Sequence, residues 1–143
     1  MIQNTEPLKL EYDENTKKMQ FNGKTLEPAV RTIDEMCEVL HDQVYCAQAG
    51  REIQTYHMYR AAIQDQDKEL FEKNALRYDV TVLFPEPLGR ELNKTAGHYH
   101  EIAPSGKSYP ELYQVLQGNA HYLLQKRVDN KMDELEDVVL VKA

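Results

Sequence analysis

The chain has 143 residues, of which 29% are charged, and its formal net charge is −7 at pH 7. This length suits one domain with its own core, and the acidic balance argues against a general nucleic-acid binder. We expect no membrane segment, because no apolar run approaches the ~20 residues that a spanning helix needs, and residues 1–10 lack the layout of a signal peptide.

The two cysteines, Cys37 and Cys46, are too few for the framework of a small disulfide-rich protein. We therefore expect reduced thiols in a cytoplasmic protein. A disulfide between the two cysteines is the alternative.

Residues 1–49 are expected to form an N-terminal segment with one short helix. The dipeptide Asn22-Gly23 indicates a turn. In the stretch "TIDEMCEVLHDQ", Thr32 and Glu35 have the spacing of a capping box. Apolar residues recur at helical spacing in the same stretch and predict one buried face: Ile33, Met36, Cys37 and Leu40.

Residues 50–143 carry a strand pattern and are expected to supply the strands of a barrel. The stretches "EIQTYHMYRAAI" and "RYDVTVLF" are rich in aromatic and β-branched residues. In the second stretch, alternation places Val80 and Val82 on one face and Thr81 on the other. The intervening "QDQDKELFEKNA" is expected to be a loop.

Further strands are expected around "ELNKTAGHYHE", "ELYQVLQ" and "AHYLLQKR". The stretch "DNKMDE" interrupts the pattern, and "DVVLVKA" resumes it. Short strands joined by Gly and Pro turns predict an all-β sandwich or barrel, with residues 1–143 forming a single domain.

Two histidines, His98 and His100, stand two positions apart within one of these expected strands. Alternate residues of a strand point the same way, whereas on a helix the two side chains would diverge by about 200°. A hairpin would bring Glu111 beside them, and two imidazoles with a carboxylate suit Fe, Mn, Ni or Zn. The alternative is a strand with two exposed histidines.

The stretch "TAGHYH", followed by a loop and "YPELYQVLQGNAHYLLQ", resembles the first metal-binding motif of the cupin superfamily. It is most similar to the cupin-type glucose-6-phosphate isomerases of archaea and some bacteria. The resemblance covers residues 78–125, and more weakly 25–59. It implies a cupin jelly-roll barrel, usually a homodimer, in which a divalent metal, most often Fe, assists the interconversion of glucose 6-phosphate and fructose 6-phosphate.

The resemblance also implies roles for individual residues. Glu111 matches a metal ligand that is the proposed catalytic base, and Tyr113 matches a tyrosine that lines the substrate site. The remaining implied site residues are the metal-binding His98 and His100 and the sugar-phosphate contacts Thr81, Thr95 and Gly97. A carboxylate base would move a proton between C1 and C2 through an enediol, and a hydride shift is the alternative.

One departure from the family pattern concerns the C-terminal part. Cupins carry a later motif with a further metal-binding histidine, and His121 stands too early to supply it. We therefore expect a barrel that is incomplete at the C-terminus, in a chain cut from a longer protein. Two other functions stay open: a different metal-dependent cupin enzyme such as a dioxygenase, and a non-catalytic sugar-binding module.

Overall fold

The computed structural model describes residues 10–128 and 131–143. The chain divides into two compact units, and the boundary lies between Glu101 and Ile102. We call residues 10–101 the first unit and residues 102–143 the second unit, and each is described by itself. That residues 1–143 form a single domain stays a prediction.

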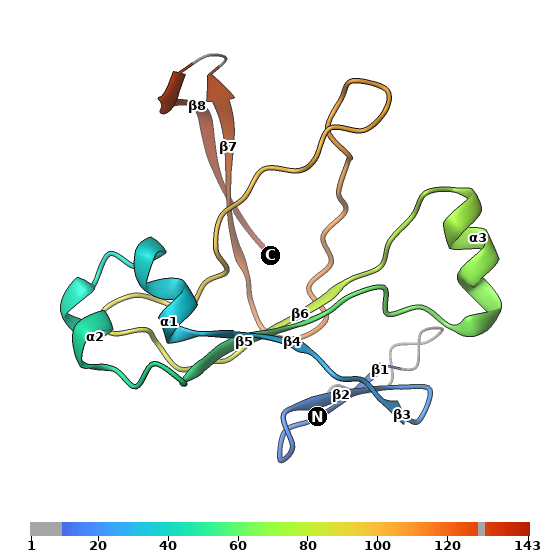
Figure 1. Cartoon of the computed structure of the whole chain (residues 1–143), viewed down its shortest axis with the longest axis horizontal. Helices are drawn as coiled ribbons and strands as arrows, with labels where there is room; N and C mark the ends of the chain where they lie inside the picture. The colour runs from blue at the N-terminus through green and yellow to red at the C-terminus, as the bar shows by residue number, and fades with distance from the viewer. Residues whose placement is uncertain (1–9, 129–130) are drawn as a thin grey trace. The chain divides into compact units, whose positions relative to one another are not determined.

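The first unit contains two small antiparallel sheets (Figure 1). A tight turn at Asn22 and Gly23, with φ values of 50° and 76°, joins two strands of one sheet, which confirms the predicted turn. The six strands are β1 (Leu10–Asp13), β2 (Lys18–Phe21) and β3 (Lys24–Thr25) in one sheet, and β4 (Ala29–Thr32), β5 (Gln54–Tyr59) and β6 (Val80–Leu83) in the other.

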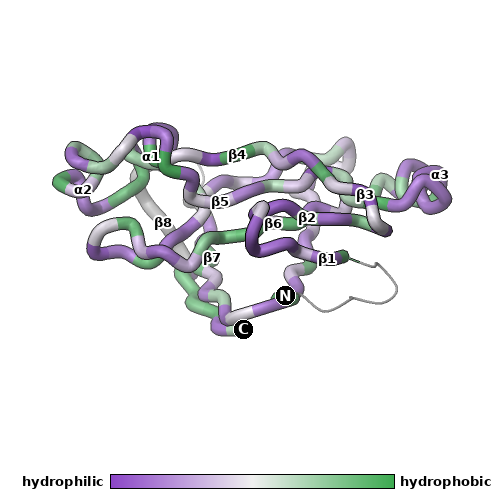
Figure 2. The backbone as a smooth tube through the Cα atoms, turned by 90° about the horizontal axis from the view of Figure 1, so that it is seen from below, coloured by the Kyte–Doolittle hydropathy of each residue, from purple (hydrophilic) through white to green (hydrophobic). Residues whose placement is uncertain are grey.

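The sheet β4-β5-β6 confirms the strands predicted at 52–63 and 77–84. Strand β5 lies in the middle, and Tyr56 pairs with Leu83 of β6. Val80 and Phe84 are buried while Thr81 is exposed, so the predicted alternation is confirmed. Figure 2 shows hydrophilic and hydrophobic stretches following one another along the backbone.

The helical stretch after β4 is not one helix, so that prediction was wrong. It consists of α1 (Ile33–Met36), the 3-10 turn η1 (Cys37–Val39) and α2 (Gln43–Gln48). Leu40 adopts an extended conformation, and its side chain is buried in the core. Asp42 is the N-cap of α2, where its side chain accepts a hydrogen bond from the Tyr45 N–H. The expected capping contact is present at α1, where the Thr32 N–H donates to Glu35 at 3.0 Å.

The predicted apolar face does form a core. The buried cluster joins α1 and α2 to β5 and to the turn after β6, and it consists of Ile33, Met36, Leu40, Cys46, Tyr56 and Leu88. Burial of this apolar surface is the main driving force for folding of this region.

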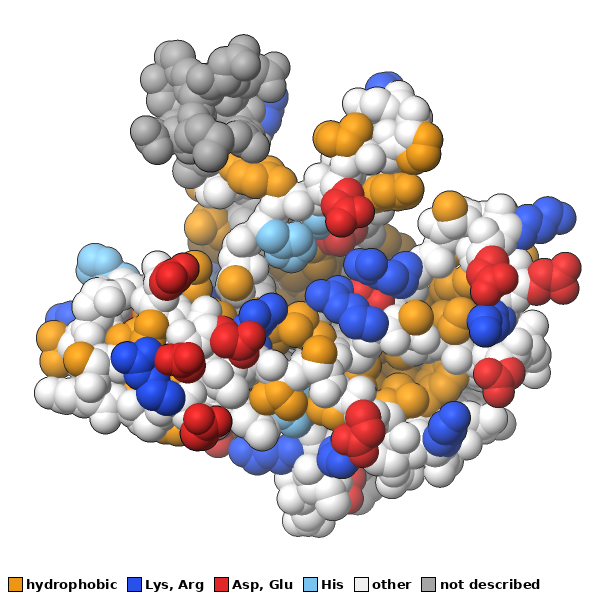
Figure 3. Space-filling model, viewed as in Figure 1, with side chains coloured by type: hydrophobic (Ala, Val, Ile, Leu, Met, Phe, Trp, Pro, Cys, Tyr) orange, Lys and Arg blue, Asp and Glu red, His pale blue; other side chains and the backbone are white. Residues whose placement is uncertain are grey.

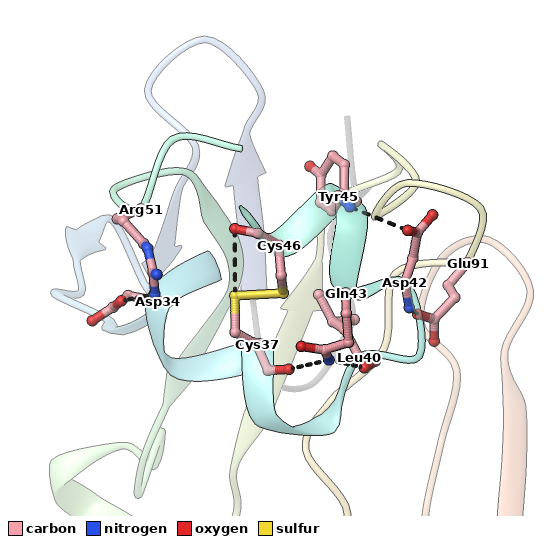
Figure 4. Close-up of a disulfide and its surroundings, with 9 residues drawn as sticks. All are labelled: Asp34, Cys37, Leu40, Asp42, Gln43, Tyr45, Cys46, Arg51 and Glu91. Carbon is pink, nitrogen blue, oxygen red and sulfur yellow. Dashed lines mark hydrogen bonds and ion pairs between the residues drawn. A yellow bond between two sulfur atoms is a disulfide. The ribbon is translucent and has the colours of Figure 1, made fainter. Parts of the chain in front are cut away.

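Cys37 and Cys46 are joined by a disulfide, which corrects the prediction of reduced thiols (Figure 4). Their Cα atoms lie 5.5 Å apart, within the range that a disulfide spans. The kink at Leu40 turns α2 back beside η1 and brings the two cysteines together. The prediction of reduced thiols rested on the small number of cysteines, which says nothing of this proximity.

The polar stretch 64–75, predicted to be a loop, is helical. It forms the 3-10 turn η2 (Asp65–Asp67) and the helix α3 (Lys68–Lys73). Good helix formers such as Leu, Glu and Lys fill it, and the side chain of Asn74 donates to the Leu70 carbonyl at 2.8 Å. In Figure 1, α1 and α2 lie at one end of the β4-β5-β6 sheet and α3 at the other.

The second unit consists of a long loop and the antiparallel hairpin of β7 (His121–Val128) and β8 (Lys131–Lys142). These strands confirm the two predicted at 120–127 and 137–143. Residues 129–130 of the predicted interruption lie outside the described residues, and β8 has already begun at Lys131. Leu123 and Leu140 face each other across the hairpin and are both exposed.

Two predicted strands are absent from the described residues: neither 91–101 nor 111–117 belongs to a strand. Only isolated bridges occur nearby, between Leu88 and Glu91 and between Ile102 and Ser108. The described strands form small antiparallel sheets and no closed barrel. The described part of the chain is therefore β-rich with three short α-helices, rather than all-β with one.

Among the described residues, no helix is both long and apolar enough to cross a membrane.

Candidate metal and substrate site

The histidine pair lies in an extended segment, residues 92–100, that follows a tight turn in the first unit. Gly89 makes this turn with φ of 67°, and a side chain there would collide with Tyr45 and Asp42. The rings of His98 and His100 lie side by side, with centroids 5.5 Å apart and planes tilted by 42°. The expected neighbouring placement of the two imidazoles is therefore found, although the segment is not part of a strand.

Charged side chains fix the start of this segment. Asp42 accepts from the backbone and the guanidinium of Arg90, and the Asp42 N–H donates to Glu91 at 2.8 Å. The Asp42 carboxylate also accepts from the Tyr45 N–H. That bond first, and then the bonds from Arg90, hold the pKa of the Asp42 carboxyl below its usual value. Glu91 also pairs with Lys94 at 2.7 Å, which lowers the pKa of Glu91. Lys94 therefore already has a carboxylate partner.

The predicted phosphate contacts lie on the surface of the first unit. Thr81 is exposed on β6, and Thr95 and Gly97 are exposed on the extended segment. A Cβ atom on Gly97 would meet no described atom within 4 Å, and its φ does not require glycine. The described residues therefore give no steric reason for a glycine at 97, in contrast to Gly89.

Glu111 lies in the second unit and is coupled to Tyr113. Partial desolvation and a hydrogen bond with Glu111 raise the pKa of Tyr113 to about 12, and the neutral phenol donates to the carboxylate. The ring of Tyr113 packs against Tyr122 of β7 with centroids 4.9 Å apart. Strand β7 therefore supports Tyr113, and Tyr113 in turn holds Glu111.

Other aromatic and histidine side chains near β5 are structural. His57 is buried, its two ring nitrogens face the Lys17 carbonyl and the Gln54 side chain, and burial lowers its pKa. Tyr56 is 3% exposed and its hydroxyl accepts from the Ala96 N–H at 3.4 Å.

Sequence reasoning missed the residues that hold the extended segment, Asp42 and Asn93. Asp42 had a visible signal, since an Asp before a helical pattern is a good N-cap, but the pattern was interpreted as one unbroken helix. Asn93 gives no signal in a single sequence, because its partners, Thr55 of β5 and Phe84 after β6, are not its neighbours in the sequence. Acidic and basic side chains are interspersed over the face shown in Figure 3.

The first unit thus carries two adjacent imidazoles, and the second unit carries a carboxylate held by a tyrosine. Imidazole and carboxylate groups are the side chains that bind first-row divalent metal ions. The family model described as "Glucose-6-phosphate isomerase (GPI)" matches residues 30–143. Because this match covers most of the chain, the chain belongs to the cupin-type glucose-6-phosphate isomerase family.

One curated relative is similar over part of its length. It is a "Glucose-6-phosphate isomerase" from Pyrococcus abyssi (strain GE5 / Orsay), 37% identical over 70 residues, which are 49% of this chain and 32% of the relative. The matched part thus spans about a third of that protein. No solved structure matches this chain.

Proposed function

We propose that the chain is the metal-binding part of a glucose-6-phosphate isomerase, which interconverts glucose 6-phosphate and fructose 6-phosphate in glycolysis and gluconeogenesis. The family match over residues 30–143 carries this proposal, because it includes both histidines and Glu111. A cupin barrel, a homodimer and a cytoplasmic location are parts of the same proposal.

His98, His100 and Glu111 are the proposed metal ligands. Two neutral imidazoles and one carboxylate match the preferences of first-row divalent ions, and Fe is proposed first, ahead of Mn, Ni or Zn. The adjacent rings in the first unit support this ligand set.

The bound ion would supply Lewis-acid stabilisation of the negative charge that develops on the substrate oxygens. Glu111 is the proposed base: its carboxylate removes the proton from C2 of the aldose and returns it to C1 of the enediol. The neutral Tyr113 hydroxyl donates to Glu111 and holds the carboxylate in place. Tyr113 is also proposed to line the substrate site.

The substrate phosphate is proposed to bind hydroxyl and backbone donors rather than a lysine. Thr81, Thr95 and the Gly97 N–H are the candidates, since all three residues are exposed. This arrangement agrees with an acidic chain, because oriented N–H and O–H groups can hold an anion without a net positive charge. Lys94 is engaged with Glu91 and is not needed.

A coupled assay from fructose 6-phosphate to glucose 6-phosphate, with and without chelator, tests the proposal. We expect turnover that chelator removes and added Fe²⁺ or Mn²⁺ restores. A chain that takes up no transition metal would contradict the isomerase and the dioxygenase-like alternative alike and favour a sugar-binding module. Metal uptake with oxygen-dependent chemistry but no isomerisation would favour the dioxygenase-like alternative.

A further inference from the structure

The segment that carries the histidine pair is held to its sheet by side chains instead of a strand ladder. Residues 92–100 belong to no strand, yet they follow directly on a turn whose bonds to Asp42 are well defined. Paired imidazoles bind a metal tightly only if their backbone is fixed, because the ordering of a mobile segment opposes binding. Some contact between the turn and His98 must therefore fix the segment.

The side chain of Asn93 makes that contact. Its Nδ2 donates to the Thr55 carbonyl at 2.6 Å and to the Phe84 carbonyl at 2.9 Å. Thr55 lies on β5 and Phe84 follows β6, and the Phe84 N–H donates to the Thr55 carbonyl at 3.2 Å. The amide of Asn93 therefore closes the end of the β5–β6 ladder.

The buried surroundings make this bond specific for an amide donor. Thr55 is 0% exposed and Phe84 5%, so both residues whose carbonyl groups accept these bonds are buried. A reversed amide would aim its oxygen at two carbonyl oxygens, which fixes the orientation of the Asn93 side chain. Among the described residues, the Oδ1 atom of Asn93 is buried without a hydrogen-bond partner, so the donors are what the position uses.

A second bond continues the path toward the histidines. The Ala96 N–H donates to the buried Tyr56 hydroxyl at 3.4 Å, and the His98 ring nitrogen Nδ1 lies 3.4 Å from the Ala96 carbonyl oxygen. Asn93 lies between the turn and Ala96, and its hydrogen bonds attach the segment to the β5–β6 sheet.

We propose that Asn93 is a positioning residue, whose amide fixes the segment 92–100 on the β5–β6 sheet and thereby sets the spacing of His98 and His100 for a divalent metal. This role rests on the proposed metal site. It makes Asn93 part of the support around the ligands, where loss of a supporting contact typically weakens metal affinity by about 10–100-fold.

The test is a Co²⁺ titration of the whole chain, followed by the visible absorption of the bound ion. Asn93→Asp puts a carboxylate oxygen against two carbonyl oxygens, and Asn93→Ala removes the donors without adding charge. The matched control is Asn74→Asp, because the Asn74 amide also donates to a carbonyl, that of Leu70, but in α3. Thermal unfolding checks that each variant is folded.

We expect Asn93→Asp and Asn93→Ala to raise the Kd for Co²⁺ by about 10–100-fold and to alter the Co²⁺ spectrum, with Asn74→Asp like the wild type. In the metal-free chain, hydrogen exchange of the Ala96 amide should become faster in Asn93→Ala. A folded Asn93→Ala variant with unchanged Kd, spectrum and exchange would overturn the role of Asn93 alone. A wild-type chain that binds no Co²⁺ would overturn the metal site and, with it, this role.

Discussion

The two units hold their proposed site residues in different ways. The first unit carries His98 and His100 on a segment tied to a buried core that includes Met36 and Tyr56. In the second unit, no described side chain of residues 102–143 is buried, and Glu111 is held by Tyr113. The comparison shows that the segment with the two histidines is supported by the buried core of the first unit, whereas Glu111 is supported by surface contacts within the second unit.

The largest expected effect is a difference in unfolding free energy between a substitution in the core of the first unit and a substitution in the second unit. Met36 is 0% exposed and Leu123 is 66% exposed. Met36→Ala should lower the free energy of unfolding by about 2–5 kcal/mol, because it removes buried apolar contacts and leaves a cavity, whereas Leu123→Ala should stay within about 0.5 kcal/mol. Urea unfolding of both variants measures this. Equal losses would show that the comparison is wrong.

Removal of the disulfide should affect the first unit next most strongly. Cys37 and Cys46 are separated by 9 positions, and closing a loop of this size restricts the unfolded chain. The double substitution Cys37→Ser and Cys46→Ser should cost about 3 kcal/mol of unfolding free energy. The unfolding midpoint of the wild type should fall similarly in a dithiol reductant. No change in either experiment would argue against a formed disulfide.

Loss of one proposed histidine ligand should lower the affinity for metal. His98→Ala should weaken Co²⁺ or Fe²⁺ binding by more than the about 10–100-fold typical of a lost supporting contact, because a ligand atom disappears. His41→Ala is the control, since His41 is exposed outside the segment. Isothermal titration gives both affinities. Equal metal binding by the two variants would exclude His98 as a ligand.

The smallest effect is a pH dependence at the turn before the histidines. The pKa of Asp42 is lowered by the Tyr45 N–H and by Arg90, so its contribution to stability is present above the unfolded pKa of about 3.9 and is lost as pH falls below it. The difference in unfolding free energy between wild type and Asp42→Asn should therefore shrink from about pH 6 to about pH 3. For Asp34→Asn, which loses an exposed ion pair with Arg51, we expect a smaller difference at about pH 6. A difference for Asp42→Asn that is constant with pH would contradict the charged role of Asp42.

Local sequence pattern predicted the parts of the fold that depend on neighbouring residues. The alternation in β6, the turn at Gly23 and the placement of His98 beside His100 all follow from short spacings. The break at Leu40 and the disulfide did not follow, because a tertiary preference for burial of Leu40 overrode an unbroken helical pattern.

The supports of the candidate site were beyond sequence pattern for a similar reason. Asn93 donates to the carbonyl groups of Thr55 and Phe84, 38 and 9 positions away in the chain, and a single sequence carries no trace of such a pairing. The strand predicted at 91–101 is not formed, because this segment has no strand partner and side chains such as Asn93 hold it instead. The helix α3 was missed because its two apolar residues, Leu70 and Phe71, stand in a mostly polar stretch, and such a stretch is also typical of loops.

The central claim is that Glu111 is the base of a metal-dependent isomerase. The most direct measurement is the turnover of Glu111→Gln in the coupled assay, with metal occupancy measured on the same sample and Glu52→Gln as an exposed acidic control. We predict that kcat falls by about 10²–10⁴-fold in Glu111→Gln while the control is unchanged. Turnover of Glu111→Gln near that of the wild type, at equal metal occupancy, would contradict the proposed base.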